Sequence, residues 1–339
     1  MKWLLGAIIL LVSAQAAQAT PLFATDAPIR ISIKGPIGLI ARTAAESVQP
    51  RDAVLTLASP AETHAIRLSP RGISRRKGDI CEFPPLRVEF AQPPATTSLF
   101  AGQRRLKLVT HCRPSEGFQQ HLLLEYSVYR LFNQATPLSY RARLATVEYV
   151  EPNGKAVTTR WGFFIEDLDD VAKRNGLKEA QVGDRVSASQ LEARQAGRIA
   201  LLQYMIGNLD WSMRAGPAGE GCCHNSRLLA APGGAYQPVA YDFDYSGLVD
   251  APYAIPPEGF SISSVRTRVY QGFCRHNSGA LAAATDLRAK RGALEAVFSQ
   301  VPGMSERTKA KSLAYLAGFF KDVATDEAVQ RQLLKKCIG

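Results

Sequence analysis

The sequence predicts an α+β protein in which a strand-rich N-terminal half precedes a helix-rich C-terminal half. Up to residue 166, apolar and polar residues alternate within short segments, which is typical of strands. After that point, apolar residues recur at helical spacing over longer segments. We therefore expect a strand-rich lobe at 20–166, a helical lobe at 167–339 and a ligand-binding cleft between them.

Strand-like segments dominate the first half of the chain. The segments with alternating or β-branched composition are 29–33, 53–57, 65–68, 86–90 and 106–109. A helix at about 118–133 is expected after them. Pro137, which cannot continue a helix, lies just beyond its end. Segments 140–150 and 156–166 then form a hairpin across Pro152-Asn153-Gly154, which is a strong turn signal.

Helical periodicity dominates the second half. Segment 189–207 fits one long helix, with Ile199, Leu202 and Ile206 on one stripe. Two short strands are expected after this helix, at 227–230 and 238–243. The remaining helices are expected at 279–299, 305–320 and 326–336.

The first 19 residues have the composition of a secretory signal peptide. Lys2 precedes the apolar run Leu4–Val12, and Ala17-Gln18-Ala19 is a small-residue cleavage site. The alternative is an N-terminal membrane anchor, which the shortness of the apolar run disfavours. We expect an exported protein, periplasmic or secreted, with no transmembrane segment after signal cleavage.

The cysteines fit an oxidising compartment, because all six lie after the predicted signal. Their positions favour a bond between Cys81 and Cys112 and another that ties Cys337 to Cys274. Cys222 and Cys223 are adjacent, so they bond to each other or one of them bonds elsewhere. A zinc site with His224 is a further alternative, which the missing spacer disfavours.

The composition is that of a basic globular protein. Hydrophobic residues are 46%, which excludes a largely disordered chain, and the formal net charge is +11. This charge favours anionic partners. The basic residues are dispersed and Arg75-Arg76-Lys77 is the only uninterrupted trio, so nucleic acid or another anionic polymer is a less favoured partner.

Two carboxylates in Tyr241-Asp242-Phe243-Asp244 are candidate metal ligands. They follow a short apolar strand, and Mg²⁺ prefers hard oxygen ligands of this kind. The alternative is a turn in which Asp242 and Asp244 accept hydrogen bonds from nearby backbone groups.

Asp210 and Asn225 are candidates for catalysis and metal binding. Asp210 follows the long helix, and Asn225 lies beyond a glycine-rich loop. An Asp in such a loop can accept the proton of a nucleophile, and a later Asn can hold a metal ion. The alternative is that Asp210 only caps the segment that follows.

Lys107 and Glu125 are candidates for a nucleotide-phosphate site. Lys107 lies on the strand face opposite Leu106 and Leu108, and Glu125 lies within an apolar helix. A carboxylate there requires a partner, and Lys107 is the candidate. Alternatively, both side chains point into solvent.

The order of these candidates resembles that of the CotH-like (spore-coat) atypical bacterial protein kinases. Arg71-Gly72-Ile73-Ser74 is similar to an early motif of that family, and Leu86–Phe90 to the strand after it. Gly162–Glu166 resembles the strand that leads into the hinge, and Asp242-Phe243-Asp244 resembles the Asp-x-Asp metal motif. The resemblance covers roughly residues 60–250, and it implies a two-lobed atypical protein-kinase-like fold.

The resemblance also implies how ATP would bind. Lys107 would contact the phosphates and pair with Glu125. Arg71 would lie near the phosphates, and Glu166 would mark the hinge near the adenine. ATP, or another nucleoside triphosphate, would then be the phosphate donor.

The resemblance assigns the remaining candidates to catalysis. Asp210 would be the catalytic Asp, and Asn225 and Asp242 would hold Mg²⁺ or Mn²⁺. Asp244 would be a second possible ligand. The implied activity is that of a metal-dependent phosphotransferase that acts on an unknown acceptor.

A catalytically inactive exported pseudokinase, or an envelope interaction protein, is the alternative function. The N-terminal half has no G-x-G-x-x-G loop. Asp210 and Asn225 are 15 residues apart, whereas the kinase catalytic loop places such residues five apart.

Overall fold

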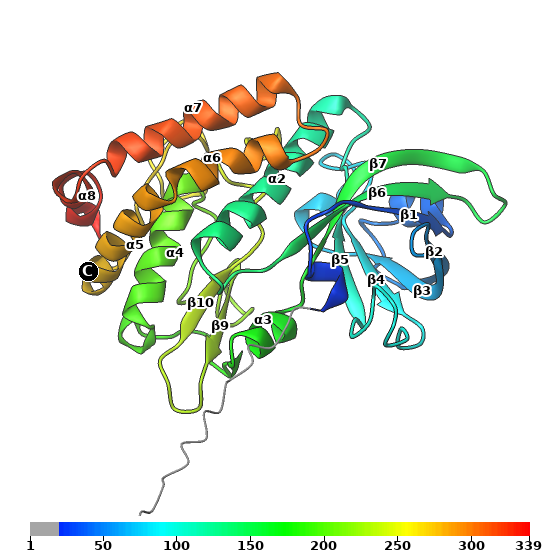
Figure 1. Ribbon diagram of the computed structural model, residues 1–339, viewed down its shortest axis with the longest axis horizontal. Helices are drawn as coiled ribbons and strands as arrows, with labels where there is room; N and C mark the ends of the chain where they lie inside the picture. The colour runs from blue at the N-terminus through cyan, green and yellow to red at the C-terminus, as the bar shows by residue number, and fades with distance from the viewer. Residues whose placement is uncertain (1–19) are drawn as a thin grey trace, which may run out of the picture.

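The computed structural model describes residues 20–339, in which a β-barrel and a helical part lie side by side (Figure 1). The predicted signal peptide, residues 1–19, lies outside the described residues. The barrel contains the first strands of the chain and the β6–β7 hairpin. The helical part contains most of the chain after residue 166 and helix α2.

The barrel is closed, and its strands follow the order β1-β2-β3-β4-β5-β7-β6. All neighbours are antiparallel except β1 and β6, whose parallel pairing from Ile29–Ala145 to Lys34–Val150 closes the barrel. The strands are β1 (Ile29–Lys34), β2 (Arg51–Leu57), β3 (Glu62–Pro70), β4 (Leu86–Phe90), β5 (Arg105–Val109), β6 (Ala142–Val150) and β7 (Ala156–Ile165).

A small antiparallel sheet in the helical part has the strand order β10-β9-β8. Its strands are β8 (Lys178–Glu179), β9 (Ser226–Ala230) and β10 (Gln237–Ala240). The helices of the described chain are α1 (Ile37–Arg42), α2 (Glu116–Ala135), α3 (Leu168–Arg174), α4 (Ala193–Ile206), α5 (Asn277–Ala289), α6 (Arg291–Gln300), α7 (Glu306–Asp322) and α8 (Asp326–Gln332).

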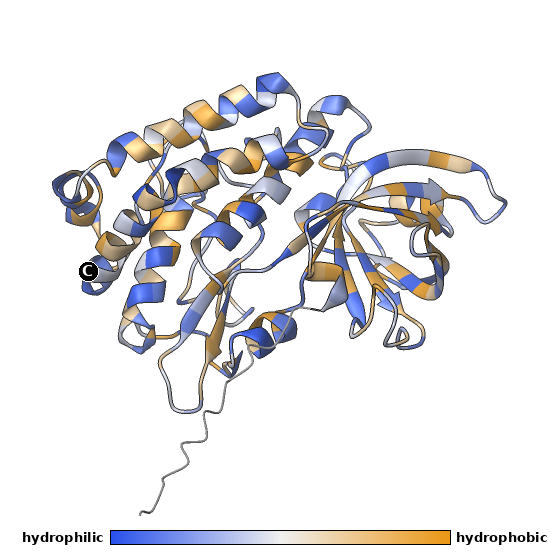
Figure 2. Ribbon diagram, in the orientation of Figure 1, coloured by the Kyte–Doolittle hydropathy of each residue, from blue (hydrophilic) through white to orange (hydrophobic). Residues whose placement is uncertain are grey.

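Two hydrophobic clusters form the core of the described chain, one inside the barrel and one among the helices. Strand β7 contributes to both, because Phe164 points into the barrel and Phe163 points toward the helices. Figure 2 shows hydrophobic and hydrophilic residues interspersed along the barrel strands and the helices. The barrel therefore packs against α2 through its outer face.

The predicted two-lobed atypical protein-kinase-like fold is wrong. The structure has a closed seven-stranded mixed barrel, a small three-stranded sheet and eight helices within residues 20–339, and no separate open N-lobe sheet. The physical reason is the pairing of β1 with both β2 and β6. Hydrophobic alternation reports which face of a strand is buried, but it does not report which strands are neighbours.

The predicted elements are otherwise largely confirmed. The hairpin forms as β6 and β7, and the helix predicted at 118–133 is α2. The helix predicted at 279–299 is interrupted at Lys290, which ends α5 and precedes α6. The long helix predicted at 189–207 begins only at Ala193, after a short 3₁₀ turn.

The structure pairs all six cysteines. The expected bonds Cys81–Cys112 and Cys274–Cys337 are present, and Cys222 bonds to Cys223. Among residues 20–339, none of the helices combines the length and apolar character needed to span a bilayer.

Candidate functional site

A cavity of about 450 Å³ lies between the barrel and the helical part. It is lined from one side by the β3–β4 connection and β5, and from the other by segments around β9 and β10. The structure brings six of the predicted site residues to this cavity: Arg71, Lys107, Asp210, Asn225, Asp242 and Asp244. Lys107 and Asp242, which are far apart in the sequence, therefore line one space.

Cationic side chains come mainly from the barrel. Leu106 and Leu108 point into the barrel core, so alternation along β5 turns Lys107 toward the cavity. Arg87 lies directly opposite Lys107 on the neighbouring strand β4. Arg71 follows β3, where its backbone N–H donates to the Pro85 carbonyl at 2.8 Å. The barrel thus presents Arg71, Arg87 and Lys107 to the cavity.

Lys107 is held in an environment that disfavours its charge. Burial, followed by the charge of Arg71, lowers the pKa of Lys107 to about 8. The Lys107 ammonium lies 5.1 Å from the centre of the Tyr241 ring, and the charge of Asp242 favours its protonated form. A phosphate would supply the missing negative charge.

Acidic side chains come from the segment after β10. Asp242 adopts a left-handed backbone conformation, with φ of 62°, and its N–H donates to the Tyr129 hydroxyl at 3.2 Å. Asp244 is buried, with 5% of its surface exposed. A positive φ at a non-glycine residue costs free energy and is common at functional sites, and Asn225 has one too, with φ of 46°.

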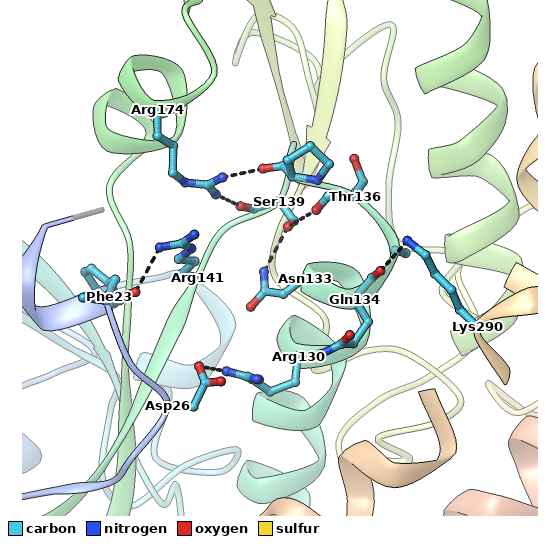
Figure 3. A pocket seen from close by; sticks show the side chains of 13 residues that line it. Phe23, Asp26, Arg130, Asn133, Gln134, Thr136, Ser139, Arg141, Arg174 and Lys290 are labelled. Carbon is cyan, nitrogen blue, oxygen red and sulfur yellow. Dashed lines mark hydrogen bonds and ion pairs between the residues drawn. The ribbon is translucent and has the colours of Figure 1, made fainter. Parts of the chain in front are cut away.

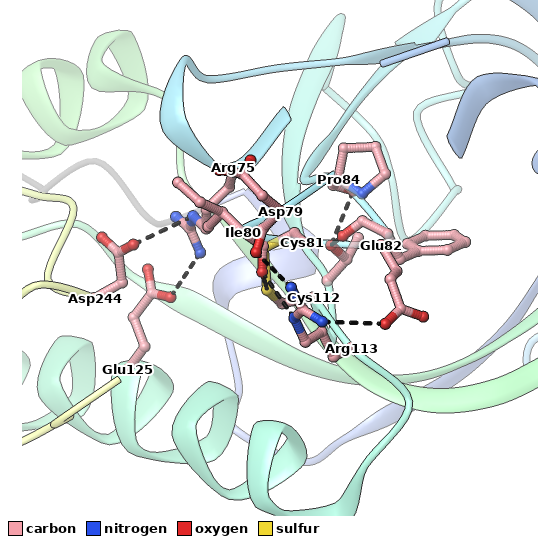
Figure 4. The surroundings of a disulfide bond; sticks show 12 residues. Arg75, Asp79, Ile80, Cys81, Glu82, Pro84, Cys112, Arg113, Glu125 and Asp244 are labelled. Atoms are coloured by element: carbon pink, nitrogen blue, oxygen red, sulfur yellow. Dashed lines mark hydrogen bonds and ion pairs between the residues drawn. A yellow bond between two sulfur atoms is a disulfide. The ribbon is translucent and has the colours of Figure 1, made fainter. Parts of the chain in front are cut away.

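Arg75, which sequence reasoning missed, lies among the carboxylates of Glu125, Asp242 and Asp244, which we call the acidic cluster. Figure 4 shows Arg75 beside Glu125 and Asp244. Its guanidinium forms three ion pairs, with Glu125 and Asp242 at 3.2 Å and with Asp244 at 3.3 Å. Glu125 therefore pairs with Arg75, and the predicted pairing with Lys107 is wrong. Arg75 belongs to the basic trio Arg75-Arg76-Lys77, whose composition suggested a solvent-exposed surface. In the structure Arg75 is buried, and its guanidinium is the ion-pair partner of Glu125.

The three carboxylates crowd one another. Oxygens of Glu125, Asp242 and Asp244 lie within 4.8 Å of each other, close enough to hold one metal ion. Burial is the main factor that raises the pKa of Glu125 to about 8 and that of Asp244 to about 6, while Arg75 opposes both shifts. Glu125 Oε1 is buried and has no hydrogen-bond partner in the described chain.

Asp210, His224 and Asn225 form a second polar group in the cavity. His224 Nε2 lies 2.6 Å from Asp210 Oδ1, and Asn225 Nδ2 donates to Asp210 Oδ2 at 3.0 Å. The hydrogen bond to Asp210 is the main factor that raises the pKa of His224. The zinc alternative loses its thiolates, because Cys222 and Cys223 form a disulfide.

Glu166 lies outside the main cavity and is fully buried. Arg174 Nε donates to its Oε1 at 3.0 Å, and the backbone N–H of Arg141 donates to its Oε2 at 2.9 Å. Glu166 instead lines an adjoining cavity of about 290 Å³, which shares Arg87, Lys107 and Arg227 with the main one. The two cavities therefore adjoin each other, with Lys107 in the lining of both.

The loop that carries Arg75 is fastened to the end of β5. The Cys81–Cys112 disulfide joins them, and the Arg113 Nε donates to the Ile80 carbonyl at 3.0 Å (Figure 4). Arg113 also pairs with Glu82. These contacts restrict the position of Arg75, and through it they restrict the acidic cluster.

Comparison with known proteins adds no identity to this geometry. No protein-family model matches the chain, and no curated protein matches it. The resemblance to CotH-like kinases therefore stays a prediction, and the functional argument depends on the residues of the cavity.

Proposed function

We propose that the protein is a metal-dependent phosphotransferase that uses a nucleoside triphosphate. One observation carries the proposal: cations from the barrel and carboxylates from the helical part face each other across a single cavity of about 450 Å³. This pattern suits a metal-bound polyphosphate. Its phosphates are negative and would contact the cationic side chains, and its metal ion is positive and would contact the carboxylates.

The phosphate chain would bind along the cationic side. Lys107 and Arg71 would contact the terminal phosphates, and Arg87 would extend this surface toward the adjoining cavity. The nucleoside would occupy that adjoining cavity, where Glu166 holds the segment after β7 in place through its bonds to Arg174 and Arg141. The anion would also favour the charged form of Lys107.

The acidic cluster fits a magnesium or manganese ion. Its donors are carboxylate oxygens, and the orphaned Glu125 Oε1 is a buried acceptor that a cation would satisfy. Asp242 would be the main ligand, and Asp244 and Asn225 would supply further oxygens. Glu125, on helix α2, would add one carboxylate oxygen. The ion would neutralise charge on the phosphates during transfer.

Asp210 would act as the general base, held in place by His224 and Asn225. An acceptor hydroxyl would give its proton to Asp210 as its oxygen forms a bond to the terminal phosphorus. The bond from that phosphorus to the bridging oxygen would break, and the nucleoside diphosphate would leave. The products would be the phosphorylated acceptor and the nucleoside diphosphate, and Asp210 would then release its proton to solvent.

A binding and transfer assay tests this proposal. ATP with Mn²⁺ should raise the melting temperature, because a ligand that binds only the folded state stabilises it. Labelled ATP should yield a phosphorylated product, and Asp210→Asn should lower transfer by about 10²- to 10⁴-fold while nucleotide binding is retained. Absence of both stabilisation and transfer with Mg²⁺ and with Mn²⁺ would refute the proposal.

A nucleotide-binding protein without transfer activity is the second candidate, and Arg75 favours it. The Arg75 guanidinium already supplies a positive charge to all three carboxylates. In that case ATP would bind equally well with EDTA and with Mn²⁺, and Asp242→Asn would leave its affinity unchanged. The phosphotransferase proposal requires the opposite result in both measurements.

We also propose that the protein is exported. Three disulfides support this proposal, since such bonds persist in oxidising compartments. Fractionation of cells that express the full chain should recover a product shortened by the predicted signal peptide outside the cytoplasm. A full-length product confined to the cytoplasm would contradict this.

A further inference from the structure

A second cavity, of about 440 Å³, is distinct from the candidate site, and most of the charged side chains that line it are cations (Figure 3). It is formed by the segment that precedes β1, the C-terminal end of α2, the connection from α2 to β6, α3, and the junction between α5 and α6. Four basic residues line it: Arg130, Arg141, Arg174 and Lys290. It shares no lining residue with the candidate site.

The acids near this cavity do not balance its cations. Glu166 forms an ion pair with Arg174, whose guanidinium donates to both of its carboxylate oxygens. Among residues 20–339, Asp26 is the only acid that lines the cavity; it pairs with Arg130, and 64% of its side chain is exposed. One solvent-exposed carboxylate therefore faces Arg130, Arg141 and Lys290.

The three remaining cations retain unused donors. Arg141 Nη1 donates to the Phe23 carbonyl at 3.2 Å, and the Lys290 ammonium donates to the Gln134 carbonyl at 2.9 Å. A guanidinium has five N–H groups and an ammonium has three, so these contacts leave most donors free. Figure 3 shows that Arg130 and Arg141 come from different elements and project toward the same space.

Two of these arginines also repel each other. Only 12% of the Arg130 side chain is exposed. Burial, followed by the charge of Arg141, lowers the pKa of Arg130 from its usual value. Two positive charges that lie close together in a partly buried space repel each other. A bound anion would offset this repulsion.

We propose that this cavity binds a small phosphate monoester, with Arg130 and Arg141 as its main anchors. Paired guanidinium groups match phosphate oxygens bidentately, and Lys290 adds a third positive charge suited to a dianion. The volume exceeds the need of a bare phosphate and lies in the usual range for small-molecule sites, so an organic group accompanies the phosphate.

Calorimetric titration of the purified protein tests this site with two probes, inorganic phosphate and ribose 5-phosphate. Ribose 5-phosphate should bind more tightly, and Arg130→Gln and Arg141→Gln should each weaken its binding at least tenfold. Arg67→Gln, which removes an exposed arginine of β3 paired with Glu89, is the matched control and should change nothing. Equal affinity in Arg141→Gln and the unchanged protein would overturn the proposal.

Asp26→Asn keeps the proposal testable where an arginine variant fails to fold. It removes the carboxylate that competes for Arg130, so the affinity for ribose 5-phosphate should rise severalfold; no rise would count against the site. Binding that disappears in Lys107→Met but persists in Arg141→Gln would belong to the candidate site and would overturn this assignment. Tighter binding of citrate, or of inorganic phosphate, than of ribose 5-phosphate would refute the monoester assignment.

Discussion

The two cavities are almost equal in volume, about 450 and 440 Å³, but they differ in how their charges are arranged. In the candidate site, Arg71 and Lys107 face Asp210, Asp242 and Asp244. In the second cavity, Arg130, Arg141 and Lys290 face one exposed acid, Asp26, because the fourth cation, Arg174, pairs with Glu166. A cavity lined by several cations and several carboxylates suits a ligand that carries its own cation, whereas a cavity with an excess of cations suits an anion without one.

The difference teaches that net charge alone does not identify a ligand. The chain carries a formal net charge of +11, which favours anionic partners but does not select a place on its surface. Buried carboxylates make the candidate site distinct, because Glu125 and Asp244 are costly to bury without a cation.

Asp242→Asn is expected to have the largest effect. The change removes the charge of the most accessible carboxylate of the cluster but keeps its shape, so metal-dependent transfer should fall by roughly 10³-fold or more. Transfer of label from ATP measures this. Asp52→Asn, at an exposed position of β2, is the matched control and should leave transfer unchanged. Equal loss in the two variants would contradict a role for Asp242 in the cluster.

Arg75→Met should produce the next largest effect, on stability. The variant leaves the buried Glu125 and Asp244, and the partly exposed Asp242, without their cation, which should cost about 3–5 kcal/mol of unfolding free energy in EDTA. Mn²⁺ should recover more stability in this variant than in the unchanged protein, because the metal then supplies the missing charge. Chemical denaturation measures both effects.

The control for Arg75 is Arg67→Met, since Arg67 forms an exposed pair with Glu89. Exposed pairs contribute about 0–1 kcal/mol, so little change is expected there. If Arg75→Met lost no more stability than Arg67→Met, the buried ion pairs would not hold the cluster together.

Removal of the Cys81–Cys112 disulfide should cost somewhat less. The bond closes a loop across 31 residues, for which the chain-entropy model gives about 3.7 kcal/mol. The double variant Cys81→Ser, Cys112→Ser should melt at a lower temperature and should also bind ATP and Mn²⁺ more weakly, because the loop of Arg75 is loosened. Removing Cys274 and Cys337 in the same way should lower stability and leave ATP affinity intact.

The sequence predicted individual strands, helices and turns, but it did not predict that the strands close into a barrel. The turn at Asn153-Gly154 and the alternation on either side predicted the β6–β7 hairpin correctly. The parallel pairing of β1 with β6 joins segments more than one hundred residues apart, and no local pattern encodes that choice. This one pairing closes the strands of the predicted strand-rich lobe into a barrel.

The candidate site shows the same limit at the level of side chains. Lys107 was predictable because Leu106 and Leu108 fix its face of β5. Arg75 was not, because its trio with Arg76 and Lys77 looks like exposed surface, and only the folded loop buries it against Glu125. His224 was considered only as a metal ligand, since its contact with Asp210 depends on how the intervening loop folds.

Lys107 provides the smallest predicted effect, a pH dependence of anion binding. Its pKa is lowered to about 8, so the free protein loses this positive charge as the pH rises from 7 to 9. The affinity for metal-free pyrophosphate should therefore fall up to about tenfold over that interval. Lys107→Arg keeps its charge throughout and should lose less affinity, which separates Lys107 from Glu125, whose ionisation near the same pH is present in both proteins. The same pH slope in both proteins would show that Lys107 does not contact the anion.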